Sequence, residues 1–420
     1  MSRSQSFKSA RQNADLTFKL NRHHGRHGWL RLTPAYSVKL VSEILTASNR
    51  GIRVLDPFSG TATTPLCAAY AGDLATGVEI NPFLTWFGNV KLATYSPASI
   101  LEASDALSSL VSRASQKSSK SVVPPPMHNL QRWWNPEELD FLCKFKAALD
   151  DTTRNDCATR DLLLVVFCRL VIKFSNAAFN HQSMSFKDKV KANASIEQQA
   201  TLFDLDPGLA HIARAEGQEV LSSAAENPSG TASVIPGDSR SVSSAVPGKY
   251  DLLITSPPYP NRMSYIRELR PYMYWLGFLN SGRDAGEMDW SAIGGTWGIA
   301  TSRLADWQRS STGFYPAYFD AILSRIRGAD KKSGVLLSNY VAKYFEDMWC
   351  HIRDMVKVMT TDGTVHYIVG NSRFYDTVVP VERLFGDMLT EAGFREARIT
   401  RIRKRNSKKE LYEFDVSARK

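Results

Sequence analysis

The sequence has few cysteines and no long apolar segment. Its five cysteines lie far apart, and no two of them form a C-x-x-C pair. This spacing argues against a structural zinc site and against a disulfide framework, and it fits a reducing compartment. No apolar run approaches the length of a membrane span, and the N-terminus is basic and polar without a hydrophobic signal core. We therefore expect a soluble, cytoplasmic protein with no membrane partner.

The composition indicates a large folded protein with an anionic partner. At 420 residues the chain exceeds one ordinary domain, so we expect two lobes or one domain with a large insertion. Hydrophobic residues make up 43% of the chain, which is enough for a sizeable core. The formal net charge of +10 favours a polyanion such as nucleic acid, although many mildly basic soluble proteins bind none.

The N-terminal region changes character within its first 50 residues. Residues 1–28 are rich in serine, arginine and histidine, and we expect a flexible basic arm. Its histidines offer metal-ligating groups, but a solvated arm is the simpler interpretation. An amphipathic run over 35–47 follows, which predicts a helix with Thr33 as its N-cap.

Strand and helix signals then alternate as they do in an α/β domain. Buried strands are expected at 52–55 and 74–80, and helices follow them at 63–71 and 82–93. This order and spacing imply parallel βαβ units. We assign 29–100 to the first part of the domain.

The middle of the chain predicts a mainly helical insertion over 101–231, which is a candidate DNA-recognition region. A polar, proline-ended linker at 115–126 leads into helical segments at 137–148 and 160–174, and a loose stretch at 222–233 closes the insertion.

The second part of the domain is assigned to 232–420. An aromatic-rich segment is expected at 265–315 and helices at 316–360. The remaining elements are strands at 232–236, 250–255 and 364–369, a helix at 381–392, and a hairpin at 397–403 and 411–416. Together these elements predict an α/β fold with a Rossmann-like sheet, mostly parallel with a C-terminal antiparallel hairpin.

The first chemical motif follows the expected strand at 52–55. The strand ends in an acid, a tight glycine-containing turn follows and a helix begins, in the order Asp56-Pro57-Phe58-Ser59-Gly60-Thr61-Ala62-Thr63-Thr64. Such a turn lets backbone approach a ligand, and a helix N-terminus offers free N–H donors. Glu79 ends the next strand, where an acid grips ribose hydroxyls in nucleotide-binding folds. A purely structural turn is the alternative.

The second motif joins a hydrophobic strand directly to Thr255-Ser256-Pro257-Pro258-Tyr259. Two prolines donate no N–H groups, and they hold the backbone in an extended bend at the strand's carboxyl end. Active sites of open α/β sheets lie at that edge. A structural turn needs no such combination.

Together the two motifs resemble those of DNA amino-methyltransferases. The first is similar to the cofactor-binding motif I of this family, and the second resembles catalytic motif IV in the S-P-P-Y form associated with N4-cytosine enzymes. By the same resemblance, Glu79 is similar to the ribose-binding acid, Gly237-Asp238 to the acid near the adenine amine, and 32–45 to the segment over the methionine end. The resemblance covers about 30–95 and 232–420, and the helical insertion matches no motif of the family.

The resemblance implies a class I methyltransferase that uses S-adenosylmethionine, acts on double-stranded DNA and needs no metal. It implies a prokaryotic, nucleoid-associated enzyme of a restriction-modification or related defence system, with a cognate restriction endonuclease as a partner. The catalytic residues that it implies are Ser256, Pro257, Pro258 and Tyr259. The cofactor-binding residues that it implies are Thr33, Asp56, Pro57, Phe58, Ser59, Gly60, Thr61, Thr63, Thr64, Glu79, Ile80, Asp238, Ser239 and Thr255.

The chemistry follows from the weak nucleophilicity of a base amine. Hydrogen bonds from that amine to the Ser256 side chain and the Pro257 carbonyl would aim its lone pair at the sulfonium methyl group. Tyr259 would stack on a base flipped out of the duplex. Methylation of a base carbon instead requires a thiolate, usually directly after a proline, and no cysteine of this chain follows a proline.

The chain departs from the family at Ala62, where a glycine is usual. An alanine there resists positive φ, and its methyl group near the cofactor would weaken binding. The long insertion between the cofactor motif and the catalytic motif also differs from the arrangement in which the catalytic motif comes first.

DNA-contacting residues are less sharply indicated. Arginines and aromatics directly after the catalytic motif are candidates for the base cleft or for phosphates, although a helix packing its aromatics into the core fits equally well. The C-terminal basic run is expected to touch the DNA backbone, with a solvated hairpin rim as the alternative. The candidates are Arg262, Tyr265, Arg267, Arg270, Arg401, Arg403, Lys404 and Arg405. A polar cluster within 176–182 fits a solvent-facing helix end better than a base reader.

Three alternatives remain open. An N6-adenine or N2-guanine enzyme, including one that acts on RNA, would share the architecture but would more often carry Asp or Asn in place of Ser256. A non-catalytic cofactor- or DNA-binding subunit would tolerate loss of the motifs, and Ala62 is the hint of that. A generic nucleotide-using α/β enzyme is disfavoured by the S-P-P-Y segment.

Overall fold

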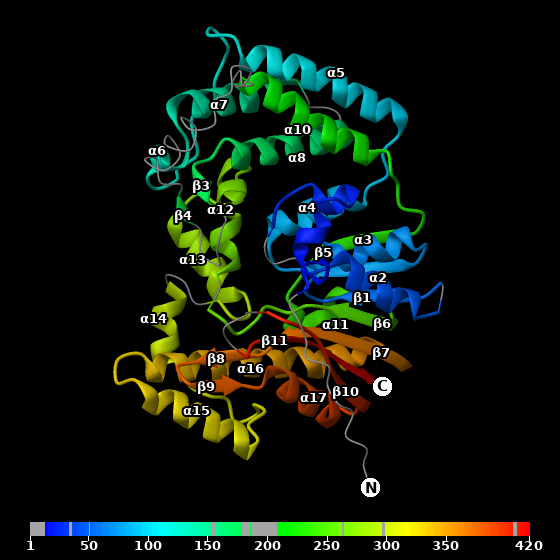
Figure 1. Cartoon of the computed structure of the whole chain (residues 1–420), viewed down its shortest axis with the longest axis vertical. Coiled ribbons are helices and arrows are strands. Elements are labelled where there is room, and N and C mark those ends of the chain that lie inside the picture. Colours follow the sequence, from blue (N-terminus) through cyan, green and yellow to red (C-terminus); the bar gives the residue numbers. More distant parts are fainter. Residues whose placement is uncertain are drawn as a thin grey trace.

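A seven-stranded sheet organises the chain, with a block of helices at one end (Figure 1). The computed structural model describes residues 13–32, 36–49, 51–152, 157–178, 185–186, 208–262, 264–295, 299–405 and 410–420. The sheet order is β10-β11-β7-β6-β1-β2-β5. Its strands are β1 (Arg53–Asp56), β2 (Leu74–Glu79), β5 (Thr231–Pro236), β6 (Tyr250–Thr255), β7 (Met359–Gly370), β10 (Arg395–Lys404) and β11 (Tyr412–Arg419).

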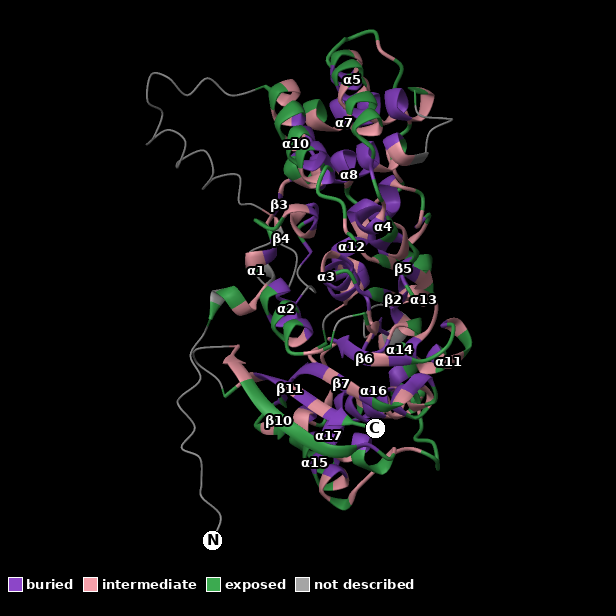
Figure 2. Ribbon diagram, turned by 90° about the vertical axis from the view of Figure 1, so that its right-hand side faces the viewer, coloured by how far each residue is buried: buried purple, intermediate pink, exposed green. Residues whose placement is uncertain are grey.

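The sheet has the expected mixture of parallel and antiparallel pairs. Strands β5, β2, β1, β6 and β7 are parallel neighbours, whereas β11 runs antiparallel to both β7 and β10. The fold is therefore the Rossmann-like class I methyltransferase sheet, and the prediction from the sequence is confirmed. The hairpin is longer than predicted, and β10 is exposed along most of its length (Figure 2).

The chain changes direction across the sheet at β1. It proceeds from β1 to β2 and β5 on one side, and it then continues through β6 and β7 on the other side. The loops that leave the carboxyl ends of β1 and β6 therefore diverge, and they leave a crevice at this switch point. Both sequence motifs lie in these two loops.

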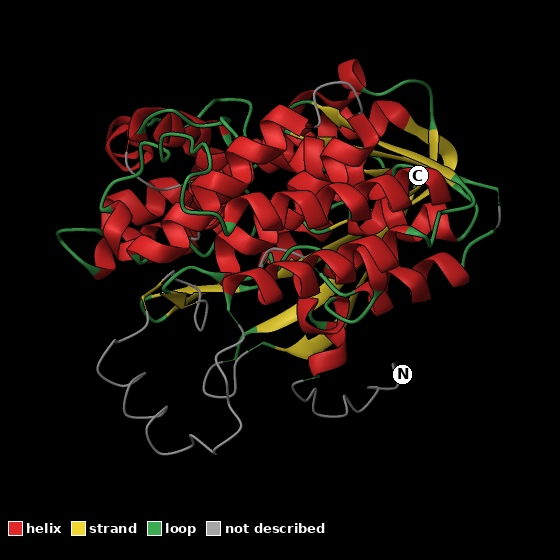
Figure 3. Ribbon diagram, turned by 90° about the horizontal axis from the view of Figure 1, so that it is seen from above, coloured by secondary structure: helices red, strands yellow, loops and turns green. Residues whose placement is uncertain are grey.

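Alternate residues of the central strands pack on opposite faces of the sheet. Val54 and Leu252 pack with one set of helices, and Leu55 and Leu253 pack with another. The first set comprises α2 (Val38–Thr46) and α3 (Thr63–Tyr70). The second set comprises α11 (Val242–Ala245), α15 (Ala317–Ala329), α16 (Gly334–Met355) and α17 (Val381–Glu391). In the view from above, helices cover most of the strands (Figure 3).

The predicted helical insertion forms the upper block in Figure 1. Its elements are α5 (Pro97–Ala114), α6 (Leu130–Trp133), α7 (Pro136–Thr152), α8 (Cys157–Lys173), β3 (Ala177–Ala178), β4 (Ser185–Phe186) and α10 (Leu209–Ala224). It shares one core with α4 (Pro82–Leu92), α12 (Tyr265–Trp275) and α13 (Gly282–Ser291). The Trp275 ring meets Trp134 and Phe167 edge-on, with centroid separations of 5.7 and 5.3 Å. The aromatic residues of α12 therefore join the insertion to the sheet domain.

Two expectations for the N-terminal region are wrong. Residues 13–28 include short helices, so this segment is not a flexible arm. Arg26 is fully buried, and its guanidinium donates hydrogen bonds to the carbonyls of Lys91 at 2.9 Å and Ala224 at 2.7 Å. Helix α2 begins at Val38 rather than after Thr33, which lies outside the described residues. The Val38 N–H donates to the Asn21 side chain at 3.0 Å, so the capping oxygen comes from a preceding segment.

The remaining elements are short connections and surface pieces. They are η1 (Ala14–Leu16), α1 (Phe18–Asn21), η2 (Gly25–Gly28), η3 (Ser239–Ser241), α14 (Ile299–Asp306), η4 (Val356–Val358), β8 (Ser372–Phe374) and β9 (Thr377–Val379). Of the helices that the structure describes, none has the length and apolar character needed to cross a membrane. Within the same described residues, no group of three or more His, Cys, Asp or Glu side chains is arranged to hold a metal ion.

Candidate active site

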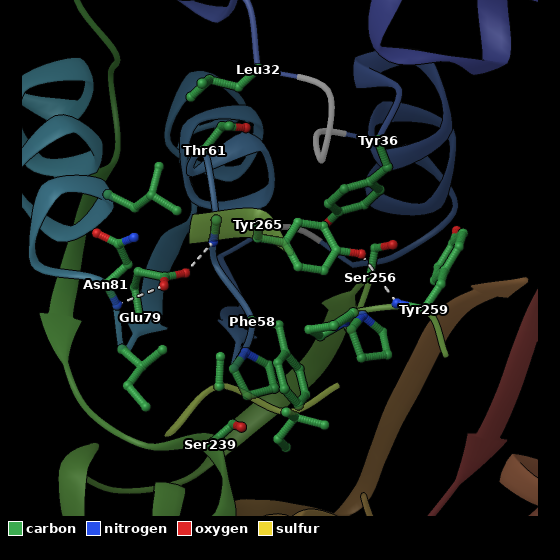
Figure 4. Close-up of a pocket in the computed structure, with 18 of the residues that line it drawn as sticks. Leu32, Tyr36, Phe58, Thr61, Glu79, Asn81, Ser239, Ser256, Tyr259 and Tyr265 are labelled. Atoms are coloured by element: carbon green, nitrogen blue, oxygen red, sulfur yellow. Dashed lines mark hydrogen bonds between the residues drawn. The ribbon is translucent and has the colours of Figure 1, made fainter. Parts of the chain in front are cut away.

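The loops that follow β1 and β6 line one cavity of about 450 Å³. Gly60 and Thr61 contribute from the first loop, and Ser256 contributes from the second (Figure 4). The cavity lies at the switch point of the sheet, where open α/β sheets bind their ligands. Two motifs that are almost 200 positions apart in the sequence thus share one site.

Glu79 fixes the first loop from the end of β2. Its carboxylate accepts hydrogen bonds from the N–H groups of Gly60 at 2.8 Å and Asn81 at 2.9 Å (Figure 4). Burial raises the pKa of Glu79 to about 7, and the two N–H groups oppose that shift. Gly60 has a φ of +50°, which favours glycine at this turn. Ile80, 36% exposed, adds an apolar surface beside the carboxylate.

The departure from the family at Ala62 brings backbone strain. Ala62 has a φ of +57° and is fully buried at the start of α3. The left-handed conformation costs a non-glycine residue about 1 kcal/mol. The methyl group lies against Gly88 and not among the residues that line the cavity. The side chain of Lys91, which is buried, donates to the carbonyl of Thr61 and so holds the strained peptide.

Asp56 supports both loops from behind the cavity. Its buried carboxylate accepts hydrogen bonds from the Thr255 hydroxyl at 2.6 Å and from the Phe58 N–H at 3.2 Å. Burial raises the pKa of Asp56 to about 6, and these hydrogen bonds oppose the shift. Asp56 therefore joins the first loop to the end of β6.

Several predicted cofactor-binding residues do not line the cavity. Their side chains are buried in the layer behind the cavity wall. They are Asp56, Ser59, Thr63, Thr64 and Thr255. The predicted residues that do line the cavity are Pro57, Phe58, Gly60, Thr61, Glu79, Ile80, Asp238 and Ser239. Thr33 lies outside the described residues.

Asp238 lines the cavity, but Arg240 engages its carboxylate. The guanidinium donates to the two carboxylate oxygens at 2.6 to 3.0 Å, and the Arg240 N–H donates at 2.9 Å. Burial raises the pKa of Asp238, but the hydrogen bonds from Arg240 outweigh it, so this pKa lies below its ordinary value. Arg240 also contacts Asp347 at 3.1 Å and the Ser291 carbonyl at 2.7 Å. Sequence reasoning missed this arginine.

A buried histidine supports Ser239 on the same side. The His351 Nδ1 lies 2.8 Å from the Ser239 carbonyl, and its Nε2 lies 2.7 Å from the Tyr367 hydroxyl. Because the carbonyl only accepts, Nδ1 donates and Nε2 accepts. Burial lowers the pKa of His351 to about 4, so the imidazole is neutral. Its ring also meets Phe58 edge-on at a centroid separation of 4.8 Å.

Ser256 stands at the cavity wall with its hydroxyl already oriented. The Ser256 hydroxyl donates to the carbonyl of Ile368 in β7 at 3.1 Å. This bond commits the hydroxyl hydrogen and leaves the oxygen lone pairs as acceptors. Pro257 and Pro258 continue the lining without donating N–H groups.

Tyr259 is held by the C-terminal hairpin. Its hydroxyl donates to Glu413 at 2.8 Å, and the same buried carboxylate accepts from Arg403 at 2.7 Å. The Arg405 guanidinium lies 4.7 Å from the Tyr259 ring centroid. Burial raises the pKa of Tyr259 well above its ordinary value, so the hydroxyl stays protonated. Glu413 also lines the cavity, and no sequence motif marks it as a partner of Tyr259.

Two hairpin arginines lie at the cavity. Arg403 and Arg405 both line it, and their contact with the DNA backbone stays a prediction. Arg403 pairs with Glu413 across the two strands, and this buried carboxylate draws its guanidinium inward. Arg401 is exposed and lies over the Tyr412 ring at 4.1 Å. Lys404 is half-buried, and residues 406–409 lie outside the described residues.

Helix α12 begins at the cavity. The Tyr265 hydroxyl accepts a hydrogen bond from the Tyr259 N–H at 3.2 Å (Figure 4). Arg262 is exposed and has a φ of +62°, and its N–H donates to the Tyr340 hydroxyl at 3.1 Å. Arg267 and Arg270 are half-buried on the same helix and do not line this cavity. Tyr265 is therefore the member of this predicted group that the structure brings into the site.

The polar cluster predicted within 176–182 is only partly described. The Asn176 N–H donates to the Trp133 carbonyl at 2.7 Å, so this residue is bonded inside the insertion. Residues 179–182 lie outside the described residues.

No protein-family model matches the chain. The chain is 20% identical to the type II methyltransferase M.BsoBI of Geobacillus stearothermophilus over 444 positions, which cover 93% of this chain and 82% of that protein. Among solved structures, an rRNA methyltransferase, aviRa of Streptomyces viridochromogenes, is 10% identical with a TM-score of 0.34, covering 98% of this chain and 96% of its own. TrmN of Thermus thermophilus is 10% identical with a TM-score of 0.28, covering 97% of this chain and 53% of its own.

Proposed function

We propose that this protein is an S-adenosylmethionine-dependent DNA methyltransferase that modifies the exocyclic N4 amine of a cytosine. The observation that carries the proposal is the single cavity lined by both Gly60 and Ser256. A cofactor held by the first loop and a base held by the second would place the two reacting groups in contact, which is the main requirement of a methyl transfer.

The cofactor half of the cavity fits an adenosine. The Glu79 carboxylate faces the cavity with lone pairs for ribose hydroxyls, as the acid at this position does in nucleotide-binding folds. Ile80 and Phe58 provide apolar surfaces for a flat ring. S-adenosylmethionine bound there supplies an electrophilic methyl group. Because Arg240 already engages Asp238, the base amine of the adenosine would share that carboxylate with a guanidinium.

The second half of the cavity fits a flipped base that carries an amine. The Ser256 oxygen and the Pro257 carbonyl are acceptors, and acceptors at this place orient an amine without removing its proton beforehand. The rings of Tyr259 and Tyr265 provide stacking surfaces, and Glu413 keeps the first of them in place. Within the described residues the cavity lining includes no cysteine, which disfavours transfer to a base carbon.

The similarity to a type II methyltransferase supports DNA as the substrate. We propose site-specific methylation of double-stranded DNA within a restriction-modification or related defence system, with a cognate endonuclease as partner. The net charge of +10 suits the polyanion.

The test is transfer of a labelled methyl group from S-adenosylmethionine to DNA, followed by separation of the modified nucleosides. N4-methylcytosine is the expected product. N6-methyladenine would contradict the assignment of the base, and label in RNA alone would contradict the assignment of the substrate. No transfer to any nucleic acid would contradict the proposed activity.

A further inference from the structure

A second cavity lies where the insertion meets α12 and α13. It also measures about 450 Å³, and the site described above does not use it. Its lining includes the aromatic rings of Trp133, Phe186, Tyr274 and His128 and the guanidinium groups of Arg132 and Arg270. Among the described residues that line it, none is acidic. A cavity that combines rings with arginines and lacks carboxylates suits an anionic ligand with a flat ring.

Two aromatic rings of this cavity and the exposed Arg132 already contact one another. Phe186 meets Trp133 edge-on at a centroid separation of 5.1 Å, and the Arg132 guanidinium lies 4.5 Å from the Phe186 centroid. Trp133 and Tyr274 are fixed in the wall, with exposures of 6% and 8%, whereas Arg132 is exposed at the rim. This arrangement presents a cation beside aromatic surface without further rearrangement.

Helix α12 connects this cavity to the candidate active site. Tyr265 lines the first cavity at the start of the helix, and Arg270 and Tyr274 line the second farther along. The nine residue steps from Tyr265 to Tyr274 span roughly 13 Å along the helix, which is about four base steps of a DNA strand. Arg267 lies between them at a helical spacing that places it on the same side as Arg270 and Tyr274.

We propose that the second cavity binds a nucleotide of the DNA a few positions from the target base and so determines part of the recognition sequence. This inference rests on the proposed function, because it takes DNA as the substrate. Arg132 contacts the edge of that base in the groove or the adjoining phosphate, and the rings provide apolar surface beside it. The helical insertion, which matches no motif of the family, thereby gains a role in choosing the site.

The experiment compares the full-length protein with Arg132→Ala, Arg132→Lys and the control Arg325→Ala. Arg325 is an exposed arginine of α15, at the opposite end of the molecule from α6 (Figure 1). Duplex binding is measured by fluorescence anisotropy, and methylation is scored on duplexes with randomised positions around the target base. We expect Arg132→Ala to weaken duplex binding about tenfold and to relax the preference at one flanking position. Arg132→Lys retains part of the affinity but not the preference, because lysine lacks the planar fork.

Two outcomes separate the possible failures. If the wild type methylates DNA while Arg132→Ala matches Arg325→Ala in both affinity and sequence preference, this inference is overturned and the proposed function stands. If the wild type methylates no duplex at all, the proposed function fails and the inference fails with it. Cofactor affinity, measured by calorimetry, is expected to be equal in all four proteins and shows that each is folded.

Discussion

The loop after β1 and the loop after β6 line the same cavity, yet different parts of the chain hold them. Neighbouring elements fix the first: Glu79 binds the Gly60 N–H, and Lys91 binds the Thr61 carbonyl. Residues from the far end of the chain fix the second, where Ser256 bonds to Ile368 and Tyr259 to Glu413. A local support can be altered without disturbing the C-terminal hairpin, and the reverse also holds. The two halves should therefore separate in kinetics, into cofactor affinity for the first and turnover for the second.

The largest effect is expected from Ser256→Ala. Loss of an acceptor that acts on the reacting amine lowers kcat by about 10²-fold, while the Kd for S-adenosylmethionine stays unchanged. Single-turnover methyl transfer and calorimetry measure the two quantities. The matched control is Ser291→Ala, since Ser291 also lines the cavity but its hydroxyl bonds to the Glu287 carbonyl. A similar loss in the control, or a loss of cofactor affinity in Ser256→Ala, would contradict the separation of cofactor binding by the first loop from turnover by the second.

The next effect concerns Glu413 as a positioning residue. Glu413→Gln weakens two charge-assisted hydrogen bonds, to Tyr259 and Arg403, and we expect kcat to fall about tenfold with unchanged cofactor Kd. Tyr259→Phe removes the same link from the other side. If the link acts as a unit, the double variant loses no more than the larger single loss. Additive losses would mean that the two residues act independently.

A smaller, pH-dependent effect is expected at Glu79, in the cofactor half of the cavity. Because the pKa of Glu79 lies at about 7, the carboxylate that accepts ribose hydroxyls forms as the pH rises through 7. Cofactor affinity of the wild type should increase between pH 6 and 8, and Glu79→Gln should lose about tenfold at pH 8 and show a flat profile. Calorimetry across this range measures both. If the cofactor affinity of the wild type varied as little with pH as that of the variant, Glu79 would not be the acceptor of the ribose hydroxyls.

The same shift affects the stability of the cofactor-free protein with the opposite sign. The folded pKa of Glu79 exceeds its ordinary value of 4.5, so the folded state holds the proton more tightly than the unfolded state. Stability therefore falls as the pH rises from about 4.5 to about 7, and Asp56 adds the same tendency between 3.8 and about 6. Thermal denaturation of the wild type and Glu79→Gln at pH 5 and 7.5 tests this, with a smaller decrease expected in the variant.

The smallest effect is expected from Ala62→Gly. Relief of the positive φ is worth about 1 kcal/mol, and loss of the buried methyl group costs about 0.8 kcal/mol. The free energy of unfolding should therefore change by less than about 1 kcal/mol, and cofactor affinity should stay within about twofold. Ala62→Val places a β-branched residue at the same φ, and we expect it to be clearly destabilising. Chemical denaturation measures the stability of both variants. Equal stability of Ala62→Gly and Ala62→Val would contradict backbone strain at this position.

The loops after β1 and β6 also differ in how much of their surroundings could be predicted from the sequence. Each loop is a continuous segment that directly follows a strand. Because parallel strands bring their carboxyl ends to one edge of the sheet, the sequence predicted that the two loops meet there. Glu413 lies 154 positions from Tyr259, and no local pattern marks that carboxylate as its partner. His351 was missed for the same reason, because it contacts Ser239, which lies 112 positions away. Arg240 lies only two positions from Asp238, but the sequence does not show that its guanidinium turns back onto that carboxylate. The basic run at 401–405 was predicted to touch the DNA backbone. Its charge pattern did not reveal that the buried Glu413 on the neighbouring strand draws Arg403 inward.

The most direct test is the structure of the protein with S-adenosylhomocysteine and a cognate duplex. We expect the adenosine beside Glu79 and Ile80, the sulfur atom between Gly60 and Ser256, and the target cytosine amine within hydrogen-bonding distance of the Ser256 oxygen. A cofactor bound elsewhere, or a target base that does not enter the cavity, would contradict this expectation.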